Sequence, residues 1–477
     1  MRIEAFMTTQ PVLSSPRIAI LGGGPGGYEA AMVAASLGAA VTVIERAGLG
    51  GSAVLTDVVP SKTLIATADL MTRVGEAGGL GVKFDLNGAD CTPSMHADLK
   101  HINARVLALA RQQSTDIQKG LENLGVRVLK GSGRLLDNHT IEVIGADGTE
   151  IMEADAIILA VGAHPRELPT ALPDGERILN WAQLYNLEEL PEELIVVGSG
   201  VTGAEFASAY NGLGSKVTLI SSGDRVLPRS DTDAAEVLEG VFERRGVKVL
   251  ARSRAEAVER TGDGVAVVLA NGVKVTGSHC LVCVGSIPNT DDIGLEAAGV
   301  ELTDSGHIKV DGVSRTTASN IYAAGDCTGV FALASVAAMQ GRIAIAHLMG
   351  DGVAPLKLIQ VASNIFTSPE IAAVGVSEED VISDKFQGDV VKLPLGSNAR
   401  AKMRNHKDGF VKIIARKGSG TVIGGVVVGP NASELIFPIA IAVAQKLHVD
   451  DVASAFTVYP SLTGSISEAA RRLHVHM

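Results

Sequence analysis

Residues 17–27 read Arg-Ile-Ala-Ile-Leu-Gly-Gly-Gly-Pro-Gly-Gly, an apolar run that ends in a cluster of glycines. The apolar run predicts a short buried strand, and the residues from Tyr28 to Leu37 predict a helix. Within the cluster, Gly22 permits a tight turn, Gly24 lets a pyrophosphate approach the backbone at the helix N-terminus, and Gly27 lets helix and strand pack closely. The stretch therefore predicts the start of a dinucleotide-binding βαβ unit.

The residues after the helix complete this unit. Residues 41–44 predict a second strand, and Glu45 follows it directly. An acid at the end of that strand accepts hydrogen bonds from the ribose hydroxyls of a dinucleotide. Glycine spacing alone is weak evidence, but strand, glycines, helix, strand and acid in register make a specific prediction.

A second unit of the same kind follows later in the chain. The predicted strand 194–197 runs into Gly198-Ser-Gly200-Val-Thr-Gly203, and a helix and the strand 217–220 follow. Two such units predict two bound dinucleotides, and hence a protein that moves electrons between two nucleotide cofactors. The predicted fold class is α/β, with two Rossmann-like domains.

The second unit differs from the first where its second strand ends. Ser221 occupies the position of Glu45, and Ser222 and Arg225 follow. An acid there would hydrogen-bond the 2′-hydroxyl of NAD and repel a 2′-phosphate, so Ser221 removes the discrimination against NADPH. Arg225 is the nearby residue that could reach the phosphate. We expect both NADPH and NADH to act as donors, with NADPH the better one.

Composition excludes several partners. The 477-residue chain has 41 basic and 53 acidic side chains and a net charge of −12, which argues against nucleic acid or an anionic membrane as the main partner. Its longest apolar stretches are too short, or too interrupted by polar residues, to span a bilayer. Residues 1–16 have no signal-peptide core and predict a flexible N-terminus and a cytoplasmic protein.

The cysteines point to a reducing compartment rather than to a disulfide framework. There are four, at positions 91, 280, 283 and 327, and they are widely scattered. Cys280 and Cys283 lie in an apolar run that predicts a strand, where residues three apart face opposite sides. We expect ordinary core cysteines and no metal site.

Between the two units, residues 50–62 read Gly-Gly-Ser-Ala-Val-Leu-Thr-Asp-Val-Val-Pro-Ser-Lys. This segment resembles the redox-active segment of the flavoprotein disulfide reductases, such as dihydrolipoamide dehydrogenase, which reads Gly-Gly-x-Cys-x-x-x-x-Cys-x-Pro-x-Lys. In that family two thiols relay electrons from FAD to a disulfide. Here Ala53 and Val58 occupy both thiol positions, whereas Lys62 is kept. The resemblance extends from about Arg17 to Arg472.

The resemblance implies a domain order and a homodimer. It assigns residues 17–165 and 290–355 to an FAD-binding domain, 166–289 to an NAD(P)-binding domain, and 356–477 to an α+β dimerisation domain. Asp326, which follows Ala-Ala-Gly, matches the aspartate that binds the ribityl chain of FAD, and Ala334 matches a backbone contact to the flavin.

The full sets of expected binding residues follow from the glycine motifs and from the resemblance. For FAD they are Gly22, Gly24, Gly27, Glu45, Gly51, Ser52, Lys62, Gly133, Ala160, Gly162, Asp326 and Ala334. For NAD(P) they are Gly198, Gly200, Thr202, Gly203, Glu205, Ser221, Ser222, Arg225 and Gly285.

The catalytic residues implied by the resemblance divide into kept and lost groups. The family motif His-Pro-Thr-x-x-Glu matches residues 459–464, so Tyr459 replaces the catalytic histidine and Gly464 the glutamate. A phenol is a poor base at neutral pH. Lys62 and Glu205 match the family pair beside the flavin, where a positive charge stabilises the reduced ring. The disulfide half-reaction is therefore lost, while flavin reduction by NAD(P)H is expected to be intact.

Electrons must then leave the flavin directly, and a quinone needs neither a thiol relay nor a strong base. Ala53 and Val58 would leave an apolar face for a flat ring, which Tyr459 of the partner subunit would cap. The expected function is an NAD(P)H:quinone oxidoreductase. The alternatives are a soluble pyridine nucleotide transhydrogenase and a non-catalytic flavin-binding redox sensor.

Overall fold

The computed structural model describes residues 15–86, 89–91 and 95–474. The expected flexible N-terminus, residues 1–16, falls almost wholly outside this range, and the side chain of Cys91 is not described either. The chain forms two compact units. Of the described residues, the first contains 15–54, 112–163 and 288–356, and the second contains 55–86, 89–91, 95–111, 164–287 and 357–474.

The first unit is built on a parallel five-stranded sheet with the order β20-β9-β1-β2-β5. Its strands read as continuous apolar runs because both faces of the sheet are covered. The bounds are β1 (Arg17–Leu21), β2 (Ala40–Glu45), β5 (Arg127–Lys130), β9 (Ala156–Leu159) and β20 (Ile321–Ala323).

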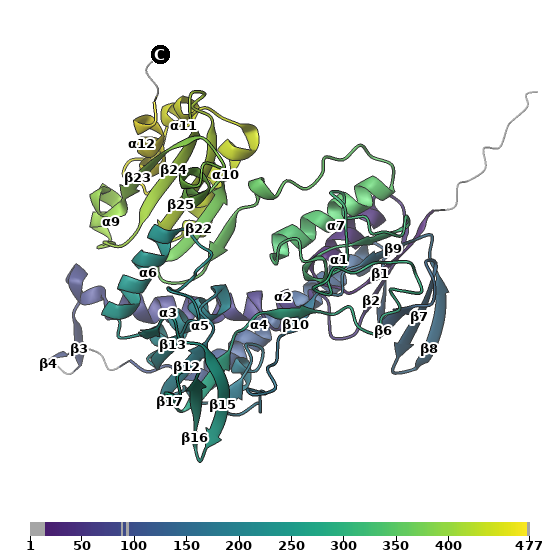
Figure 1. Cartoon of the computed structure of the whole chain (residues 1–477), viewed down its shortest axis with the longest axis horizontal. Helices are drawn as coiled ribbons and strands as arrows, with labels where there is room; N and C mark the ends of the chain where they lie inside the picture. The colour runs from purple at the N-terminus through teal and green to yellow at the C-terminus, as the bar shows by residue number, and fades with distance from the viewer. Residues whose placement is uncertain (1–14, 87–88, 92–94, 475–477) are drawn as a thin grey trace, which may run out of the picture. The chain divides into compact units, whose positions relative to one another are not determined.

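Two helices, α1 (Pro25–Ser36) and α7 (Ala334–Leu348), lie against each other over one face of this sheet (Figure 1). Their close approach depends on glycine, because a Cβ on Gly341 would lie 2.3 Å from the carbonyl oxygen of Gly26. The other face is covered by the antiparallel strands β6 (Ser132–Leu135), β7 (Thr140–Gly145) and β8 (Gly148–Glu153).

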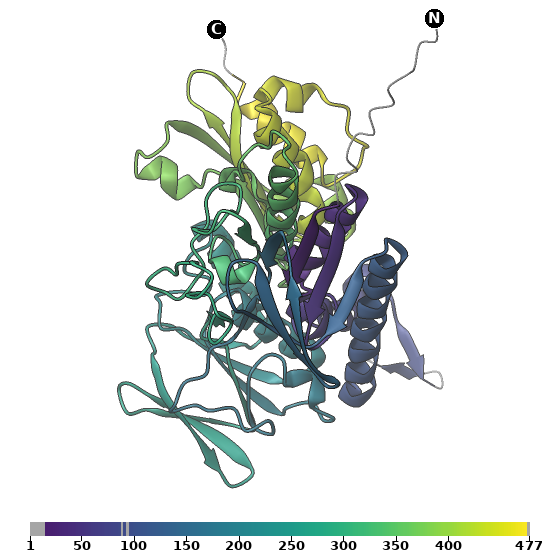
Figure 2. The same cartoon turned by 90° about the vertical axis from the view of Figure 1, so that its right-hand side faces the viewer.

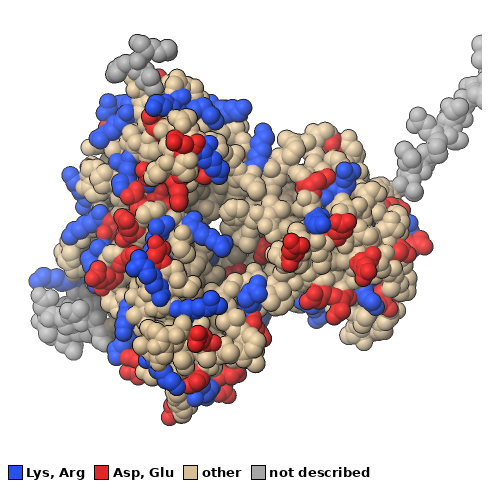
Figure 3. Space-filling view, in the orientation of Figure 1, with Lys and Arg blue, Asp and Glu red and all other residues tan. Residues whose placement is uncertain are grey.

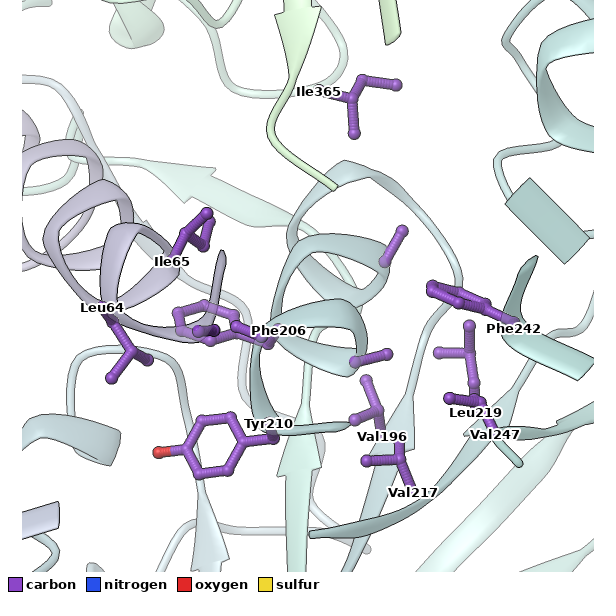
Figure 4. Close-up of a cluster of buried hydrophobic side chains, with 14 of the residues drawn as sticks. Leu64, Ile65, Val196, Phe206, Tyr210, Val217, Leu219, Phe242, Val247 and Ile365 are labelled. Carbon is purple, nitrogen blue, oxygen red and sulfur yellow. The ribbon is translucent and has the colours of Figure 1, made fainter. Parts of the chain in front are cut away.

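The second unit contains another parallel sheet, with the order β11-β18-β12-β13-β14. One face packs on α3 (Val58–Gly75), α5 (Val201–Leu213), α6 (Thr232–Arg244) and the first part of α4 (Leu99–Asn123). Figure 4 shows Phe206 and Tyr210 of α5 beside Leu64 and Ile65 of α3. The strands are β11 (Ile178–Leu179), β12 (Glu193–Val197), β13 (Lys216–Ile220), β14 (Lys248–Leu250) and β18 (His279–Val282). The opposite face packs on β15 (Ala255–Thr261), β16 (Gly264–Leu269) and β17 (Lys274–Gly277).

The C-terminal part of the second unit is an antiparallel sheet with the order β21-β22-β25-β24-β23. Helices α10, α11 and α12, yellow in Figure 2, share a hydrophobic core with this sheet. The strands are β21 (Ser363–Ile365), β22 (Glu370–Gly375), β23 (Gly388–Pro394), β24 (Phe410–Arg416) and β25 (Val422–Gly429). The helices are α8 (Glu378–Ile382), α9 (Ala399–Met403), α10 (Ala432–Gln445), α11 (Val449–Ser454) and α12 (Gly464–Arg472).

A buried lysine ties this C-terminal sheet to α6. The side chain of Lys412 on β24 is 1% exposed, and its Nζ lies 2.7 Å from Asp231 and 2.6 Å from Asp233 at the start of α6. Glu378 is a third carboxylate partner. A buried ammonium is costly unless it is paired, so these contacts fix the sheet against the helix.

Short elements complete the described chain. They are α2 (Gly51–Leu55), η1 (Ala77–Leu80), β3 (Phe84–Leu86), β4 (Ala89–Cys91), β10 (Ala163–Pro165), η2 (Leu184–Asn186), β19 (Ser286–Pro288), η3 (Asp326–Thr328), η4 (Leu358–Gln360) and η5 (Leu395–Ser397). Within the described residues, every helix is too short or too polar to cross a membrane. On the face drawn in Figure 3, acidic and basic side chains are interspersed.

The sequence-based boundaries differ from the structure mainly at helix starts. The first helix begins at Pro25, three residues before Tyr28, because proline is well suited to the first turn. Helix α3 runs from Val58 to Gly75 and tolerates Pro60 in its first turn. Cys283 lies just beyond β18, and Cys280, Cys283 and Cys327 are buried free cysteines.

Candidate cofactor sites

The first glycine motif forms a cradle at the N-terminus of α1. Gly22 has a φ of +98°, and a Cβ there would lie 2.2 Å from the carbonyl oxygen of Ala160. A Cβ on Gly27 would lie 1.9 Å from the carbonyl oxygen of Gly22. The position of a Cβ on Gly24, the N-cap, is open, and no side chain caps the helix. These are the features of a phosphate site at a helix N-terminus.

Glu45 and the loop after it complete the cradle. The Glu45 carboxylate accepts hydrogen bonds from the backbone N–H groups of Gly23 and Ala47, both at 2.7 Å. Gly51 has a φ of +57°, and a Cβ there would lie 2.9 Å from the Cα of Gly24. The glycine therefore brings the start of α2, with Ser52, against the phosphate cradle.

Asp326 begins η3 in the same unit. Its carboxylate is half-buried, and burial raises its pKa above the ordinary range. Among the described residues, this carboxylate has no hydrogen-bond partner, and α7 begins at Ala334 without a side-chain cap. An unsatisfied acceptor together with free backbone donors fits a hydroxyl-rich ligand such as the ribityl chain of FAD.

Three other residues expected at the flavin have structural roles within the protein. A Cβ on Gly133 would lie 3.0 Å from Cγ of Leu21, so this glycine permits the approach of β6 to β1. The Ala160 N–H donates to the carbonyl oxygen of Leu21 at 2.7 Å. Gly162 has a φ of +67°, which favours glycine. Their contact with FAD stays a prediction.

The second glycine motif repeats the geometry of the first in the second unit. Gly198 has a φ of +108°, and its Cβ would lie 2.2 Å from the carbonyl oxygen of Cys283. A Cβ on Gly203 would lie 1.8 Å from the carbonyl oxygen of Gly198. Gly200 is the N-cap of α5 and again has open space at its Cβ position. The residues present therefore fit a second dinucleotide, with Thr202 in the first turn of the helix.

Ser221 lies at the end of β13, as expected, but its side chain faces inward. The residue is fully buried, and its hydroxyl accepts a hydrogen bond from Ser199 at 2.7 Å and donates to the carbonyl oxygen of Arg225 at 3.0 Å. This hydroxyl is committed within the protein, whereas Ser222 is exposed and Arg225 is partly exposed. Within the described chain, the buried Nε of Arg225 has no hydrogen-bond partner. Gly285 adopts a φ of +101° with open space at its Cβ position.

Lys62 and Glu205 form a short ion pair within the second unit. Nζ of Lys62 on α3 lies 2.6 Å from Oε2 of Glu205 on α5. The Glu205 side chain is 4% exposed and that of Lys62 is 26% exposed. The pair brings together the two residues that the sequence predicted would act together, and it leaves the ammonium partly accessible.

Phe366, which directly follows β21, is a third member of this group that the sequence analysis did not single out. Its backbone N–H donates to Oε1 of Glu205 at 2.8 Å, and Nζ of Lys62 lies 4.9 Å from the centroid of its ring. Both Glu205 oxygens are thus occupied, and the ammonium contacts an aromatic face. The sequence offered one indication of this contact, an aromatic residue at the start of Phe-Thr-Ser-Pro. The hydrogen bond itself could not be predicted, because every residue except proline has a backbone N–H.

The positions that replace the catalytic thiols and histidine carry no comparable chemistry. Ala53 lies on α2, and Val58 is the first residue of α3. The described cysteines do not substitute, because burial raises the pKa of Cys280 and Cys283 and raises that of Cys327 to about 12.

Tyr459 is 85% exposed and lies between α11 and α12, and Gly464 is the first residue of α12. Phe456 and Val458 beside it are also exposed. This loop therefore presents apolar side chains to its surroundings.

Comparison with known proteins agrees with this geometry. Residues 16–341 match the family model described as pyridine nucleotide-disulphide oxidoreductase, and residues 361–470 match the dimerisation domain of that family. The chain is 53% identical to a protein of Mycobacterium tuberculosis named NAD(P)H dehydrogenase (quinone), over 96% of this chain and 94% of that protein. It is 32% identical to the dihydrolipoyl dehydrogenase of Geobacillus stearothermophilus, over 94% of each chain.

Solved structures give the same result. The crystal structure of LpdA from Mycobacterium tuberculosis matches with a TM-score of 0.92 and 52% identity, covering 96% of this chain and 100% of that chain. The HOCl-induced flavoprotein disulfide reductase RclA from Escherichia coli matches with a TM-score of 0.84 and 24% identity, covering 95% and 99% of the two chains. At that identity the second likeness concerns the fold alone.

The open position at Gly200 generates a test of the second cradle. We expect Gly200→Ala to fold normally, because its Cβ meets no protein atom, yet to weaken NADPH binding by about tenfold or more, because the methyl group occupies the place of a phosphate. Fluorescence titration of the purified protein with NADPH measures the dissociation constant. Gly24→Ala is the matched control, since it alters the other cradle. Equal NADPH affinity of Gly200→Ala and the unaltered protein would contradict the assignment.

Proposed function

The chain belongs to the pyridine nucleotide-disulphide oxidoreductase family, and we propose that it passes electrons from NAD(P)H through FAD directly to a quinone. The strongest support lies at the start of α3. That helix begins with Val58 in place of a family thiol, yet it carries Lys62 in an ion pair with Glu205. The relative that shares 53% of its residues is named NAD(P)H dehydrogenase (quinone), which agrees with this loss.

FAD, when bound, supplies a carrier that accepts a hydride and releases electrons to an acceptor. We propose that the cradle at Gly22, Gly24 and Gly27 holds its pyrophosphate, that Glu45 holds its ribose, and that Asp326 accepts a hydrogen bond from its ribityl chain. The second cradle would hold NAD(P)H through Gly198, Gly200 and Gly203. These roles rest on the open helix N-termini and on the partly buried acceptor at Asp326.

Lys62 would supply a fixed positive charge where negative charge develops during flavin reduction. Glu205 holds the ammonium in place through a charge-assisted hydrogen bond, and the Phe366 N–H occupies its other oxygen. Glu205 is thereby kept as an orienting carboxylate rather than a free base. Ala53 and Val58 supply no thiol, so the acceptor must meet the flavin itself.

We propose that the protein is a homodimer, because residues 361–470 match a dimerisation domain. The exposed apolar side chains of Phe456, Val458 and Tyr459 are the kind of surface that a partner subunit covers. Tyr459 of the partner subunit would then cap the quinone. The buried, free thiols agree with a reducing, cytoplasmic compartment.

The proposed function predicts a two-step anaerobic titration. One equivalent of NADPH should bleach the visible absorption band of the flavin, and one equivalent of benzoquinone should restore it with formation of the quinol. Recovery with NAD⁺ but not with the quinone would mean a transhydrogenase, and absence of bleaching would mean a non-catalytic flavoprotein. Dihydrolipoamide is the control reductant and should leave the band unchanged, because Ala53 and Val58 cannot exchange with a thiol.

Lys62→Met should slow the bleaching step. We expect a rate about 100-fold lower, the typical loss when one electrostatic donor is removed, with the FAD content unchanged. Phe366→Leu keeps the backbone N–H and removes only the ring, so its loss should be about threefold to tenfold. Stopped-flow spectroscopy under anaerobic conditions measures both rates, and Lys100→Met is the control for loss of an exposed lysine charge. A Lys62→Met rate within twofold of the unaltered protein would remove the lysine from the mechanism.

Arg225→Gln should change the nucleotide preference. We propose that the arginine pairs with the 2′-phosphate of NADPH, so the substitution should raise KM for NADPH about tenfold and leave KM for NADH unchanged. Steady-state kinetics with each nucleotide measures the effect. Arg229→Gln, an exposed arginine four residues away, is the matched control. An equal rise in both KM values would show that Arg225 does not read the phosphate.

A further inference from the structure

A cavity of about 340 Å³ lies in the second unit, and charged and polar residues make up most of its lining. These residues lie at the C-terminal end of α3, at Arg245 after α6, and in loops of the C-terminal segment. The α3 residues include Asp69 and Arg73, and the loops are residues 367–370 and 404–408. This volume is at the lower end of the range for small-molecule sites. The residues expected to bind FAD and NAD(P) do not line it.

Four cationic side chains line this cavity. They are Arg73, Arg245, Arg404 and Lys407. Arg245 is held in place, because its Nη1 donates to the carbonyl oxygen of Ser368 at 2.9 Å and its Nη2 lies 3.4 Å from Glu76. Arg404 and Lys407 are exposed, and neither side chain forms a hydrogen bond or ion pair with another described residue. Two cations at the cavity are thus free to bind a ligand.

The described carboxylates of the cavity leave Arg404 and Lys407 without an ion pair, although Glu76 pairs with Arg245. Glu370 accepts a hydrogen bond from the Ser433 N–H at 2.9 Å, and Asp408 is paired with Arg244, which is not among the lining residues. Burial raises the pKa of Asp69 to about 6, so its carboxyl carries a proton more readily than an exposed one. The Nε2 of His406 is buried and, in the described structure, has no partner.

We propose that this cavity binds a small phosphate ester. Guanidinium groups bind phosphate oxygens in bidentate fashion, and Arg73, Arg245 and Arg404 line one cavity with Lys407. Asp69 lies at the same cavity and can hydrogen-bond a hydroxyl of the ester. The site is separate from the two dinucleotide cradles and is additional to the proposed oxidoreductase activity.

One loop of the cavity is joined through the backbone to Phe366, which contacts Lys62 and Glu205. Thr367 and Ser368 line the cavity, and Phe366 directly precedes them. The Ser368 N–H donates a hydrogen bond to Oγ of Ser208 on α5 at 3.0 Å, which holds this loop against α5. A ligand that moves this loop would therefore act on the residue that contacts both Lys62 and Glu205.

Isothermal titration calorimetry of the purified full chain with glucose 6-phosphate, at constant ionic strength, tests this site. We expect saturable binding that the double variant Arg404→Gln/Lys407→Gln weakens by about tenfold or more. The matched control is Arg400→Gln/Lys402→Gln, which removes two charges from the same segment at residues that do not line the cavity. This control should bind as the unaltered protein does. Binding heat is independent of flavin reduction, so the result does not depend on the proposed activity.

Three outcomes would overturn the proposal. The first is absence of binding heat with the unaltered chain. The second is equal weakening in both double variants, which would mean general attraction to a basic segment. The third is loss of ester binding when NADPH saturates the protein with both cavity cations intact, which would place the ester in the nucleotide site.

Discussion

The ion pair between Lys62 and Glu205 is the interaction around which the second unit is arranged. A carboxylate that is 4% exposed is stable only when its oxygens are occupied, and here the partners come from α3 and from the backbone of Phe366. Two segments that are distant in sequence, α3 and the segment at Phe366, must therefore meet at α5. The same helix begins at the open cradle of Gly200, so nucleotide binding and the fixed ammonium depend on one rigid element.

The loss of both thiols does not disturb this arrangement. In the described structure, Lys62 is bonded to Glu205, and Glu205 also accepts a hydrogen bond from Phe366. Neither bond involves a position that the family uses for disulfide exchange. The residues that support flavin reduction are thus held in place without the residues that the family uses to reduce a disulfide. A chain can lose the thiols, the histidine and the glutamate together and still keep the frame that receives a hydride, which is why the quinone is the acceptor that the remaining chemistry fits.

Much of the fold could be predicted because glycine is required wherever the backbone leaves no room for a Cβ, and such positions are visible in the sequence. Gly22, Gly27, Gly198 and Gly203 each lie where a Cβ would collide with a carbonyl oxygen, so their spacing, together with the strand and helix patterns around them, identified both cradles. Phe366 could not be found this way, since its bond to Glu205 spans 161 residues and uses a backbone N–H. The inward turn of the Ser221 hydroxyl was also hidden, because it depends on a second hydroxyl at Ser199.

Helix α3 connects the chemistry at its start to the polar cavity near its end. Lys62 lies in its second turn and Arg73 in its last, about 16 Å apart at 1.5 Å per residue. Between them Leu64, Ile65 and Ala68 are buried in the core shared with α5, which prevents the two ends from moving separately. The cavity is therefore connected to Lys62 both along this helix and through the loop that begins at Phe366. A charge that must stay fixed for hydride transfer is supported from both sides.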